Sequence, residues 1–410
     1  MKTLLIFPGN IDNSFFINEI EFSKKRFDRV VAFVYKEKGK DYAKVAEEYG
    51  FDYFVIDEKK LSSILYVFKS LISRESDELR YEIGSAWKQK DSFVRKMGKI
   101  GYALFYYSFA CQSYYKFKKN FDKTDDIYVY SFWMSRGAVA GSMIKNKTGK
   151  VKFFSRAHGY DLYENRNALN YLPFRKYIYD SADKIFFISK QGLGYYKKKY
   201  GFSDKKLDVS YLGVKSNEEY RKEIGAVDKV RIVSCSSINS IKRLDLIISL
   251  LSGLSINYEW IHVGDGELRD EIIKLAEKKL PKGSYTFVGA LPNDKVVPLY
   301  EQMEADFFIN LSDSEGIPVS IMEALSVGLP VIARPVGGIP EIVDGKSGLL
   351  VEIKDSITKE VVDKVESFLN NRIDNIATYT DYSNAAYEMW NTNFRKETNY
   401  NKFYDTVEEL

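Results

Sequence analysis

The most constraining feature of the sequence is an alternation that continues along its whole length. Short apolar runs, rich in β-branched and aromatic residues, are each followed by an amphipathic stretch with helical period. Twelve such runs divide equally between the two halves of the chain: residues 3–7, 30–35, 53–56, 127–132, 151–155, 185–189, 230–235, 258–263, 285–288, 307–311, 330–333 and 348–351. Strands that alternate with helices predict parallel sheets covered on both faces, and two equal sets predict two doubly wound, Rossmann-like α/β domains.

The length of the chain supports the same division, because 410 residues exceed what one typical core accommodates. Composition and charge shift at residues 211–217. We therefore predict an N-terminal domain at residues 1–212 and a C-terminal domain at residues 213–387. A last helix at about 388–410, which carries a stripe of aromatic residues, is expected to complete the first domain.

Cysteine usage and hydropathy favour a cytoplasmic protein. Cys111 and Cys235 lie in different halves of the chain and suggest no disulfide framework. No segment approaches the roughly 20 apolar residues that span a bilayer. The N-terminal residues enter an apolar strand directly and do not resemble a secretory signal.

The net charge of +4 conceals an uneven distribution along the chain. Residues 1–210 hold 39 Lys and Arg against 25 Asp and Glu, a net charge of +14, whereas residues 211–410 hold 22 against 32, a net charge of −10. This asymmetry predicts that the first half faces an anionic partner. Nucleic acid, a membrane surface and a phosphorylated acceptor are the candidates.

Basic and aromatic residues are interleaved in residues 87–119. Cations beside an aromatic helix suit the surface of an anionic bilayer, which would place the protein peripherally on the inner face of the cytoplasmic membrane. A core helix with snorkelling lysines explains the same pattern, so both interpretations stay open. Nucleic acid is not expected, because no recognised binding motif accompanies the charge.

Two glutamates follow one of the strands predicted in the second half, at the edge where ligands of doubly wound sheets bind. Glu315 lies in a loop, and Glu323 lies in a helix expected at 319–327, with Pro318 suited to its first turn. Free backbone N–H groups and the positive end of the helix dipole would stand beside these carboxylates. The segment can therefore hold a phosphate and accept hydrogen bonds from sugar hydroxyls, although a capping acid beside an exposed helical acid has the same spacing.

Weaker signals stand at the neighbouring strand ends of the second half. Lys242 and Arg243 directly precede a helix, which is a suitable position for cations that neutralise a diphosphate. A basic pair exposed to solvent would give the same sequence pattern. The Gly-Asp-Gly turn that begins at Gly264 lets a ligand approach the backbone or simply reverses the chain. The loop that contains Leu291 offers backbone groups that could read a nucleobase.

In the first half, His158 and Asp161 follow the strand expected at 151–155. A lone histidine is usually a satisfied core residue, and only its position after a strand favours a place at the ligand site. The other histidine, His262, lies within a predicted strand and is expected to be structural.

In this order and spacing, these residues resemble the retaining nucleotide-sugar glycosyltransferases of family 4. The resemblance covers nearly the whole chain. It rests on the His-Gly-x-Asp step at 158–161, on Lys242, on the Gly-Asp-Gly turn, and on the Glu-x7-Glu element at 315–323 with Gly-Gly-Ile-Pro-Glu at 337–341. It implies the GT-B fold, in which the parallel sheets of two Rossmann-like domains face each other across a cleft. The N-terminal domain would bind the acceptor, and the C-terminal domain would bind the donor.

The resemblance also implies a reaction: transfer of a hexose from a UDP- or GDP-sugar to a saccharide, free or lipid-linked, in the synthesis of capsule, exopolysaccharide or O-antigen. His158, Glu315 and Lys242 would be catalytic, with Lys242 balancing the charge of the departing diphosphate. Neither a metal nor a cofactor is expected, because no Asp-x-Asp element ends a strand. An acceptor that attacks from the face of the departing phosphate needs no nucleophilic carboxylate.

Further residues receive binding roles from the same resemblance. Glu323 would hold the ribose diol, and Glu315 would contact hydroxyls of the transferred sugar. The remaining donor contacts would come from eight residues: Arg243, Gly264, Leu291, Gly316, Ile317, Pro318, Val319 and Ser320. Gly9, Asn10 and Asp161 would line the acceptor side.

The sequence departs from the family in two places. Ser236 and Ser237 stand where many members carry Gly-Arg, and Arg243 is the candidate substitute for that arginine. The loop after the first strand has one glycine, Gly9, where many members have a pair. A nucleotide-sugar epimerase of the same architecture and a non-catalytic, glycosyltransferase-like subunit are the alternative functions, although a chain with two histidines offers an epimerase few acid–base groups.

Overall fold

The computed structural model of the chain describes residues 1–9, 11, 14–57, 76–121, 126–215 and 224–410. These residues form two compact units. Unit 1 comprises Met1–Ser210 and Tyr400–Leu410, and unit 2 comprises Tyr211–Asn399. None of the helices in the described ranges is both long and apolar enough to cross a membrane.

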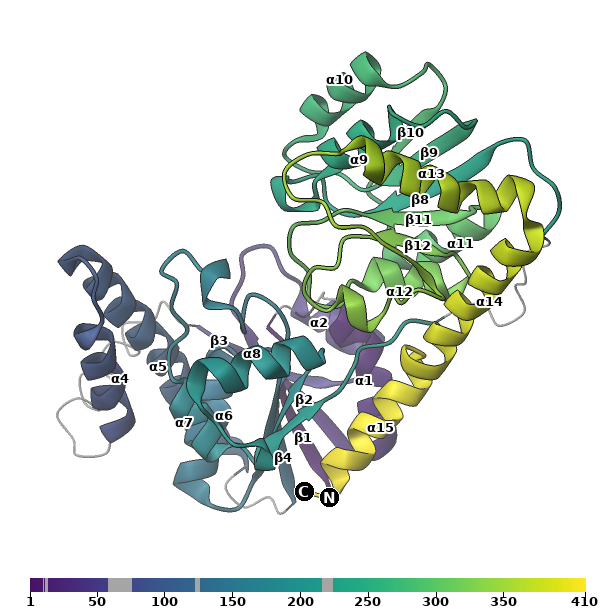
Figure 1. Cartoon of the computed structure of the whole chain (residues 1–410). Coiled ribbons are helices and arrows are strands. Elements are labelled where there is room, and N and C mark those ends of the chain that lie inside the picture. The colour runs from purple at the N-terminus through teal and green to yellow at the C-terminus, as the bar shows by residue number, and fades with distance from the viewer. Residues whose placement is uncertain (10, 12–13, 58–75, 122–125, 216–223) are drawn as a thin grey trace. The chain divides into compact units, whose positions relative to one another are not determined.

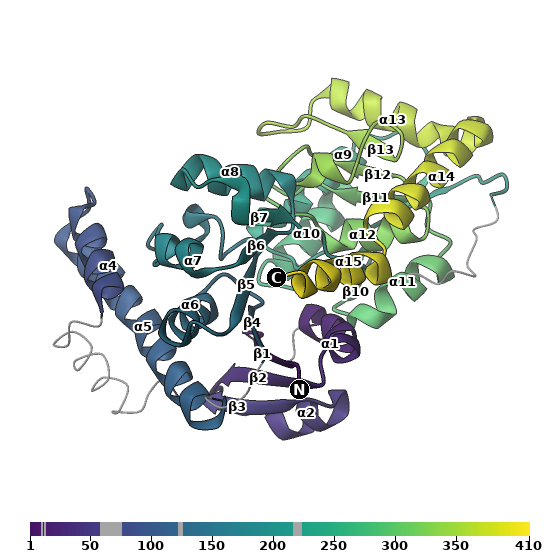
Figure 2. The ribbon, with the colours of Figure 1, turned by 90° about the horizontal axis from the view of Figure 1, so that it is seen from below.

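Unit 1 contains a sheet of seven parallel strands in the order β3-β2-β1-β4-β5-β6-β7 (Figure 1). Its strands are β1 Thr3–Phe7, β2 Arg29–Tyr35, β3 Asp52–Ile56, β4 Ile127–Ser131, β5 Lys152–Ala157, β6 Lys184–Phe187 and β7 Leu207–Val209. Its helices are α1 Ser14–Arg26, α2 Tyr42–Tyr49, α4 Asp77–Lys88, α5 Phe93–Phe121, α6 Arg136–Thr148, α7 Arg175–Ser181 and α8 Lys190–Tyr200. Helices α5, α6, α7 and α8 cover one face of the sheet, and α1 lies on the other beside α15, Lys396–Glu408 (Figure 2).

Unit 2 contains a sheet of six parallel strands in the order β10-β9-β8-β11-β12-β13. Its strands are β8 Val230–Cys235, β9 Tyr258–Val263, β10 Tyr285–Gly289, β11 Phe307–Asn310, β12 Val331–Ala333 and β13 Gly348–Leu350. Its helices are α9 Leu244–Leu251, α10 Arg269–Lys279, α11 Asn293–Gln302, α12 Val319–Ser326, α13 Lys359–Asp374 and α14 Ile376–Asn393. Buried side chains of α9, α10 and α13 form the core on one face of this sheet.

The predicted fold class is confirmed at the level of strands and sheets. Each of the twelve predicted runs is a strand, with ends that differ by no more than two residues. The sequence missed β7, since a strand of three residues at the edge of a sheet leaves no apolar run to recognise.

The C-terminal segment differs from its prediction, because it forms two helices instead of one. Helix α14 ends at Asn393, and α15 begins at Lys396. Between them, Arg395 forms an isolated parallel bridge with Val214, which redirects the backbone. Phe394 is buried at this break.

A buried ion pair attaches α15 to the sheet of unit 1. Arg156 on β5 and Glu19 on α1 are 2.6 Å apart, and both side chains are fully buried. Tyr404 of α15 donates a hydrogen bond of 3.2 Å to the other oxygen of Glu19. The Arg156 guanidinium also lies 4.0 Å from the ring centroid of Phe403. The end of the chain is therefore an integral part of unit 1.

Candidate functional site in unit 2

Lys242 and Glu315 lie together beyond the carboxyl ends of β8 and β11. Asn239 holds the turn that carries Lys242, since its side-chain oxygen accepts hydrogen bonds from the amides of Ile241 and Lys242. The Lys242 ammonium lies 2.6 Å from Oε1 of Glu315, and the side chain of Asn310 donates to the same oxygen at 3.5 Å. Glu315 is buried. A cation and a carboxylate thus meet at one sheet edge.

Unsatisfied backbone donors lie directly after Glu315. Helix α12 begins at Val319, and its positive dipole end faces the loop. Among the residues that the structure describes, the amides of Gly316, Ile317, Val319 and Ser320 donate no hydrogen bond. Pro318 is the N-cap residue of α12, one position before the first turn in which it was predicted.

Two glycines of the next loop pack against the backbone of Glu315 and Gly316. The amide of Gly338 donates a hydrogen bond of 2.7 Å to the carbonyl of Gly316. Gly337 has a φ of +57°, and a Cβ at this position would stand 1.9 Å from the carbonyl oxygen of Glu315. Only glycine permits this approach, and the contact holds the loop beside the open amides.

Glu323 lies on α12 in a desolvated position. Only 9% of the residue is exposed, and its carboxyl group makes no hydrogen bond or ion pair with any described residue. Burial raises the pKa of Glu323 to about 8, so the group is mostly protonated at neutral pH. Burial also raises the pKa of Cys235 to about 12, and the nearby Glu323 adds to that shift. Glu323 is therefore a buried acid whose carboxyl group has no partner among the residues that the structure describes.

The guanidinium of Arg243 is engaged by carboxylates within unit 2. It lies 3.0 Å from Asp245 and 3.1 Å from Asp313. Asp313 also pairs with Arg334. The other terminal nitrogen of Arg334 donates a hydrogen bond of 2.8 Å to the carbonyl of Ile353. Sequence reasoning missed Asp313 and Arg334, although Asp313 stands in the same polar run as Glu315.

Gly264 and Leu291 lie at the same sheet edge. Gly264 has a φ of +144°, and a Cβ there would stand 1.8 Å from the carbonyl oxygen of Ser236. The loop after β9 therefore packs directly on the Ser236–Ser237 loop, which explains the glycine without a ligand. Leu291 is half-buried between β10 and α11.

The remaining predicted residues belong to unit 1. His158 follows β5 and is buried, with its ring centroid 4.1 Å from that of Trp133 and 5.0 Å from that of Phe132. Within the described residues, neither ring nitrogen has a hydrogen-bond partner, and Nδ1 lies 3.8 Å from Asp161. Burial lowers the pKa of His158, so the ring is neutral at pH 7.

Asp161 and Gly9 have local roles in the loops of unit 1. The fully buried carboxylate of Asp161 accepts hydrogen bonds from the amides of His158, at 2.9 Å, and Met134, at 2.7 Å. Gly9 has a φ of +77°, and a Cβ there would stand 2.9 Å from Cδ1 of Trp133. Asn10 lies outside the described residues. Trp133, which sequence reasoning missed, is thus the common neighbour of Gly9 and His158.

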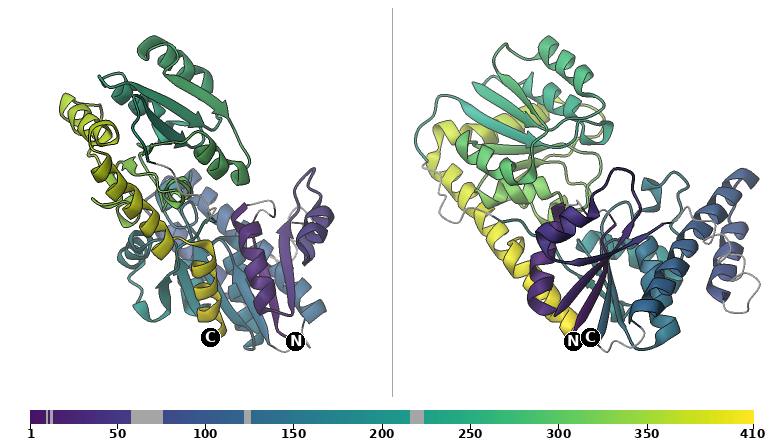
Figure 3. Two further views of the ribbon diagram at one scale, coloured as in Figure 1. Left: turned by 90° about the vertical axis from the view of Figure 1, so that its right-hand side faces the viewer. Right: turned by 180° about the vertical axis from the view of Figure 1, so that it is seen from behind.

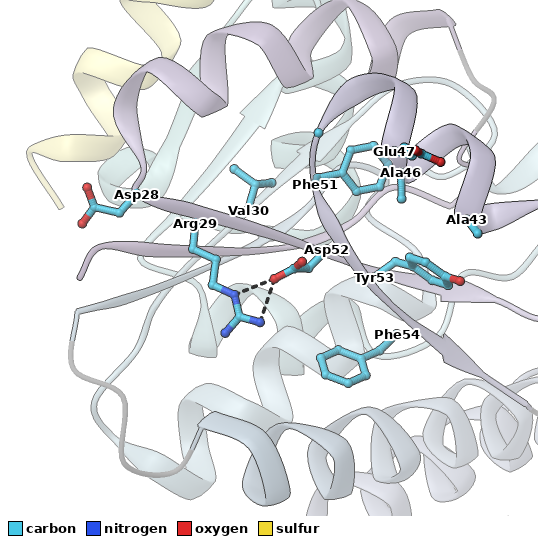
Figure 4. Close-up of a pocket in the computed structure, with 11 residues that line it drawn as sticks. Asp28, Arg29, Val30, Ala43, Ala46, Glu47, Phe51, Asp52, Tyr53 and Phe54 are labelled. Atoms are coloured by element: carbon cyan, nitrogen blue, oxygen red, sulfur yellow. Dashed lines mark hydrogen bonds and ion pairs between the residues drawn. The ribbon is translucent and has the colours of Figure 1, made fainter.

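A separate pocket in unit 1 contains none of the predicted site residues. It lies over β2 and β3, between Asp28, which directly precedes β2, and the turn of α2 that carries Glu47 (Figure 4). Its arginine, Arg29, pairs with Asp52 at 2.7 Å, as the dashed lines show (Figure 4). The pocket therefore offers a ligand no uncompensated cation.

No cluster of three His, Cys, Asp or Glu side chains with metal-binding geometry occurs within the described ranges. Independence of metal ions nevertheless remains a prediction, because the structure does not test it.

Residues 216–389 match the family model described as "Glycosyl transferases group 1". WcaL of Salmonella typhimurium, assigned by name to colanic acid biosynthesis as a glycosyltransferase, is 27% identical over 56% of this chain. The alignment spans 59% of that relative's length.

Two solved structures resemble the whole chain. A crystal structure of Anabaena Alr3699/HepE in complex with UDP and glucose matches with a TM-score of 0.66 and 13% identity, and the match covers 100% of both chains. The apo form of the lipopolysaccharide outer core galactosyltransferase WaaB matches with a TM-score of 0.69 and 15% identity, again over 100% of both chains. These matches confirm the predicted GT-B fold.

Proposed function

We propose that this protein is a retaining, metal-independent glycosyltransferase of family 4 that transfers a hexose from a UDP- or GDP-sugar to a saccharide acceptor, free or lipid-linked. The product would be a surface polysaccharide. The observation that carries the proposal is the 2.6 Å pair of Lys242 and Glu315, beside the four backbone amides after Glu315 that donate no hydrogen bond to a described residue. The match of residues 216–389 to the group 1 family supports it.

The donor diphosphate would bind where positive charge and amide donors converge. Four backbone N–H groups and the start of α12 provide donors, and Lys242 provides an ammonium group that Glu315 holds in place. Charge builds up on the diphosphate as the glycosidic bond breaks. A preorganised cation at that position stabilises the transition state more than the ground state, which is the main source of catalysis that these residues offer.

The two glutamates would bind hydroxyl groups on either side of the diphosphate. Glu315 has a carboxylate already oriented by Lys242 and Asn310, and we assign it to hydroxyls of the transferred sugar. Glu323, whose buried carboxyl makes no contact with a described polar group, is assigned to the ribose diol. Two hydroxyl donors would satisfy the carboxylate and favour its ionised form.

His158 receives the most limited role. Its ring is neutral and desolvated, so it can donate or accept one hydrogen bond without adding charge. We assign it to a sugar hydroxyl near the reacting carbon. Arg243 is not assigned to the diphosphate, because Asp245 and Asp313 already neutralise its guanidinium.

A panel of UDP- and GDP-sugars tests the proposal. The purified protein is incubated with each donor, with and without a pool of bacterial glycolipid and oligosaccharide acceptors, and release of UDP or GDP is followed. Acceptor-stimulated release from one donor, with the sugar recovered on the acceptor in its original anomeric configuration, is expected. Conversion of the donor to its epimer without transfer would identify an epimerase, and donor binding without turnover would identify a non-catalytic subunit.

A further inference from the structure

Exposed apolar side chains gather at one place in unit 1. Ten large hydrophobic residues are exposed in the described ranges, and seven of them lie on α4 and α5. Four surround the turn between these helices: Trp87, Phe93, Val94 and Met97, exposed by 48%, 67%, 79% and 47%. We call these four residues the apolar tip. An exposed cluster of this kind marks an interaction surface more often than scattered single residues do.

The apolar tip is a continuous surface. The rings of Trp87 and Phe93 meet edge to face, with centroids 6.1 Å apart. Phe93, Val94 and Met97 lie on one side of α5. At about 100° per residue, the three side chains point within about 100° of one another around the helix axis. Helix α4 and the start of α5 stand out from the sheet of unit 1 (Figures 1 and 3). A flat partner can reach the tip without displacing another described element of the unit.

Positive charge borders the apolar tip. Lys88, Lys90 and Lys96 form no ion pair with any described residue, and the Lys96 ammonium lies 5.5 Å from the ring centroid of Trp87. The nearest acid in the sequence, Asp91, is already neutralised by Lys99 at 2.7 Å. We call the three lysines the lysine rim.

The rest of the aromatic segment is core. Tyr106, Tyr107, Phe109 and Phe117 on α5 are buried within unit 1. The two interpretations of residues 87–119 therefore apply to different parts of the segment. The second half of α5 packs inside the unit, and only its first turns, with the end of α4, expose an apolar and basic surface.

We propose that the apolar tip and the lysine rim dock on the surface of a bilayer that contains anionic phospholipid. The charge of the rim selects this partner, since acidic headgroups neutralise ammonium groups while Trp87 and Phe93 enter the interfacial layer. A second copy of the chain would bring a second lysine rim to the same place, and the like charges would repel. The inference does not depend on the proposed reaction, because neither donor nor acceptor takes part in it.

Sedimentation with vesicles tests the proposal on the full-length protein. Vesicles of phosphatidylcholine alone are compared with vesicles that contain phosphatidylglycerol, at low and high salt. We expect binding that requires phosphatidylglycerol and weakens as salt is added. Each cation near an anionic surface contributes about a fivefold factor, so the triple substitution K88S/K90S/K96S should weaken binding roughly 100-fold. The double substitution W87S/F93S should weaken it at least about tenfold.

The same helix supplies a matched control. Tyr115, Lys118 and Lys119 are exposed on α5 but lie outside the tip, so Y115S/K118S/K119S should bind vesicles as the wild type does. Circular dichroism and thermal unfolding verify that each variant is folded. Absence of binding to anionic vesicles would overturn the proposal, and so would an equal loss in the control variant. A change from oligomer to monomer in W87S/F93S, with vesicle binding intact, would instead identify a protein interface.

Discussion

The carboxyl group of Glu323 links donor binding to pH. Its pKa of about 8 keeps the unliganded group protonated at pH 7, whereas hydroxyl donors favour the ionised form. We therefore expect UDP or GDP to bind more tightly as pH rises from 6 to 9, by at most about tenfold per pH unit below 8. Isothermal titration calorimetry at four pH values measures this dependence. Glu323→Gln should bind weakly at every pH, and a pH-independent affinity of the wild type would refute the role of Glu323.

Glu323 also makes the stability of the fold depend on pH. Its contribution to stability falls as pH rises, whereas nucleotide affinity is expected to rise. Because its folded-state pKa lies above the unfolded value of about 4.5, the folded chain binds more protons between these values. The contribution of Glu323 is then fully present below about pH 4.5 and is lost as pH rises towards 8. At pH 9, Glu323→Gln should therefore melt at a higher temperature than the wild type, and at pH 4 the two should be similar. A lower melting temperature for the variant at pH 9 would show that the carboxylate has a partner.

Gly337 is the residue at which a single methyl group should disturb the site. Its positive φ and its 1.9 Å approach to the Glu315 carbonyl leave no room for a Cβ. Gly337→Ala should lower the free energy of unfolding by about 1–3 kcal/mol and weaken nucleotide binding, because the Glu315 loop must shift. Gly345→Ala is the control, since a Cβ there has no atom within 4 Å. Equal effects of the two substitutions in urea denaturation would contradict this interpretation.

At the residue scale, strand-end position predicted that Lys242 and Glu315 lie at the same sheet edge, where the structure brings them together, but it did not predict their neighbours. Asp313 and Arg334 are 21 positions apart, and nothing in either segment alone indicates that they pair. The ion pairing of Arg243 could not be predicted from the sequence either. It accompanies a left-handed backbone at Arg243, with φ of 51°, and the guanidinium contacts Asp245. For His158 and Asp161, the pattern predicted that both residues lie in a loop after a strand. It did not predict that Asp161 accepts hydrogen bonds from backbone amides while the ring nitrogens of His158 accept or donate none within the described residues.

At the scale of elements, the attachment of α15 to unit 1 provides a direct test of buried electrostatics. Removing Glu19 leaves Arg156 fully buried and without its ion-pair partner. Glu19→Ala should therefore lower the free energy of unfolding by about 3–5 kcal/mol. Glu21→Ala on the same helix removes an exposed pair with Lys25 and should change it by less than about 0.5 kcal/mol. Urea denaturation of both variants measures the difference, and similar values would show that the buried pair does not anchor α15.

Two elements show the limits of a periodic pattern. Residues 87–119 read equally well as core or as an interface, because the helical period does not reveal which residues have neighbours in the folded unit. The helix predicted at about 388–410 was interrupted by the bridge between Arg395 and Val214. Such a long-range contact leaves no local signal, whereas the strands before and after each helix could be assigned from their apolar runs.

For the whole molecule, the alternation of strands and helices was sufficient to predict two parallel sheets, and the structural matches confirm the GT-B fold. The sheets follow from local patterns because right-handed crossovers leave few ways to connect parallel strands. The donor and the acceptor do not follow in the same way, since specificity depends on individual side chains and not on the fold.

The most direct measurement is the rate of nucleotide-sugar turnover in Lys242→Ala and Glu315→Ala, compared with Lys278→Ala and Glu277→Ala. The control residues are exposed on α10, in the same unit as the proposed donor site. We expect kcat to fall by at least about 100-fold in each site variant, because each loses a group that acts on the developing charge or on the transferred sugar. The controls should keep the wild-type rate. Wild-type turnover in either site variant would contradict the proposed donor site.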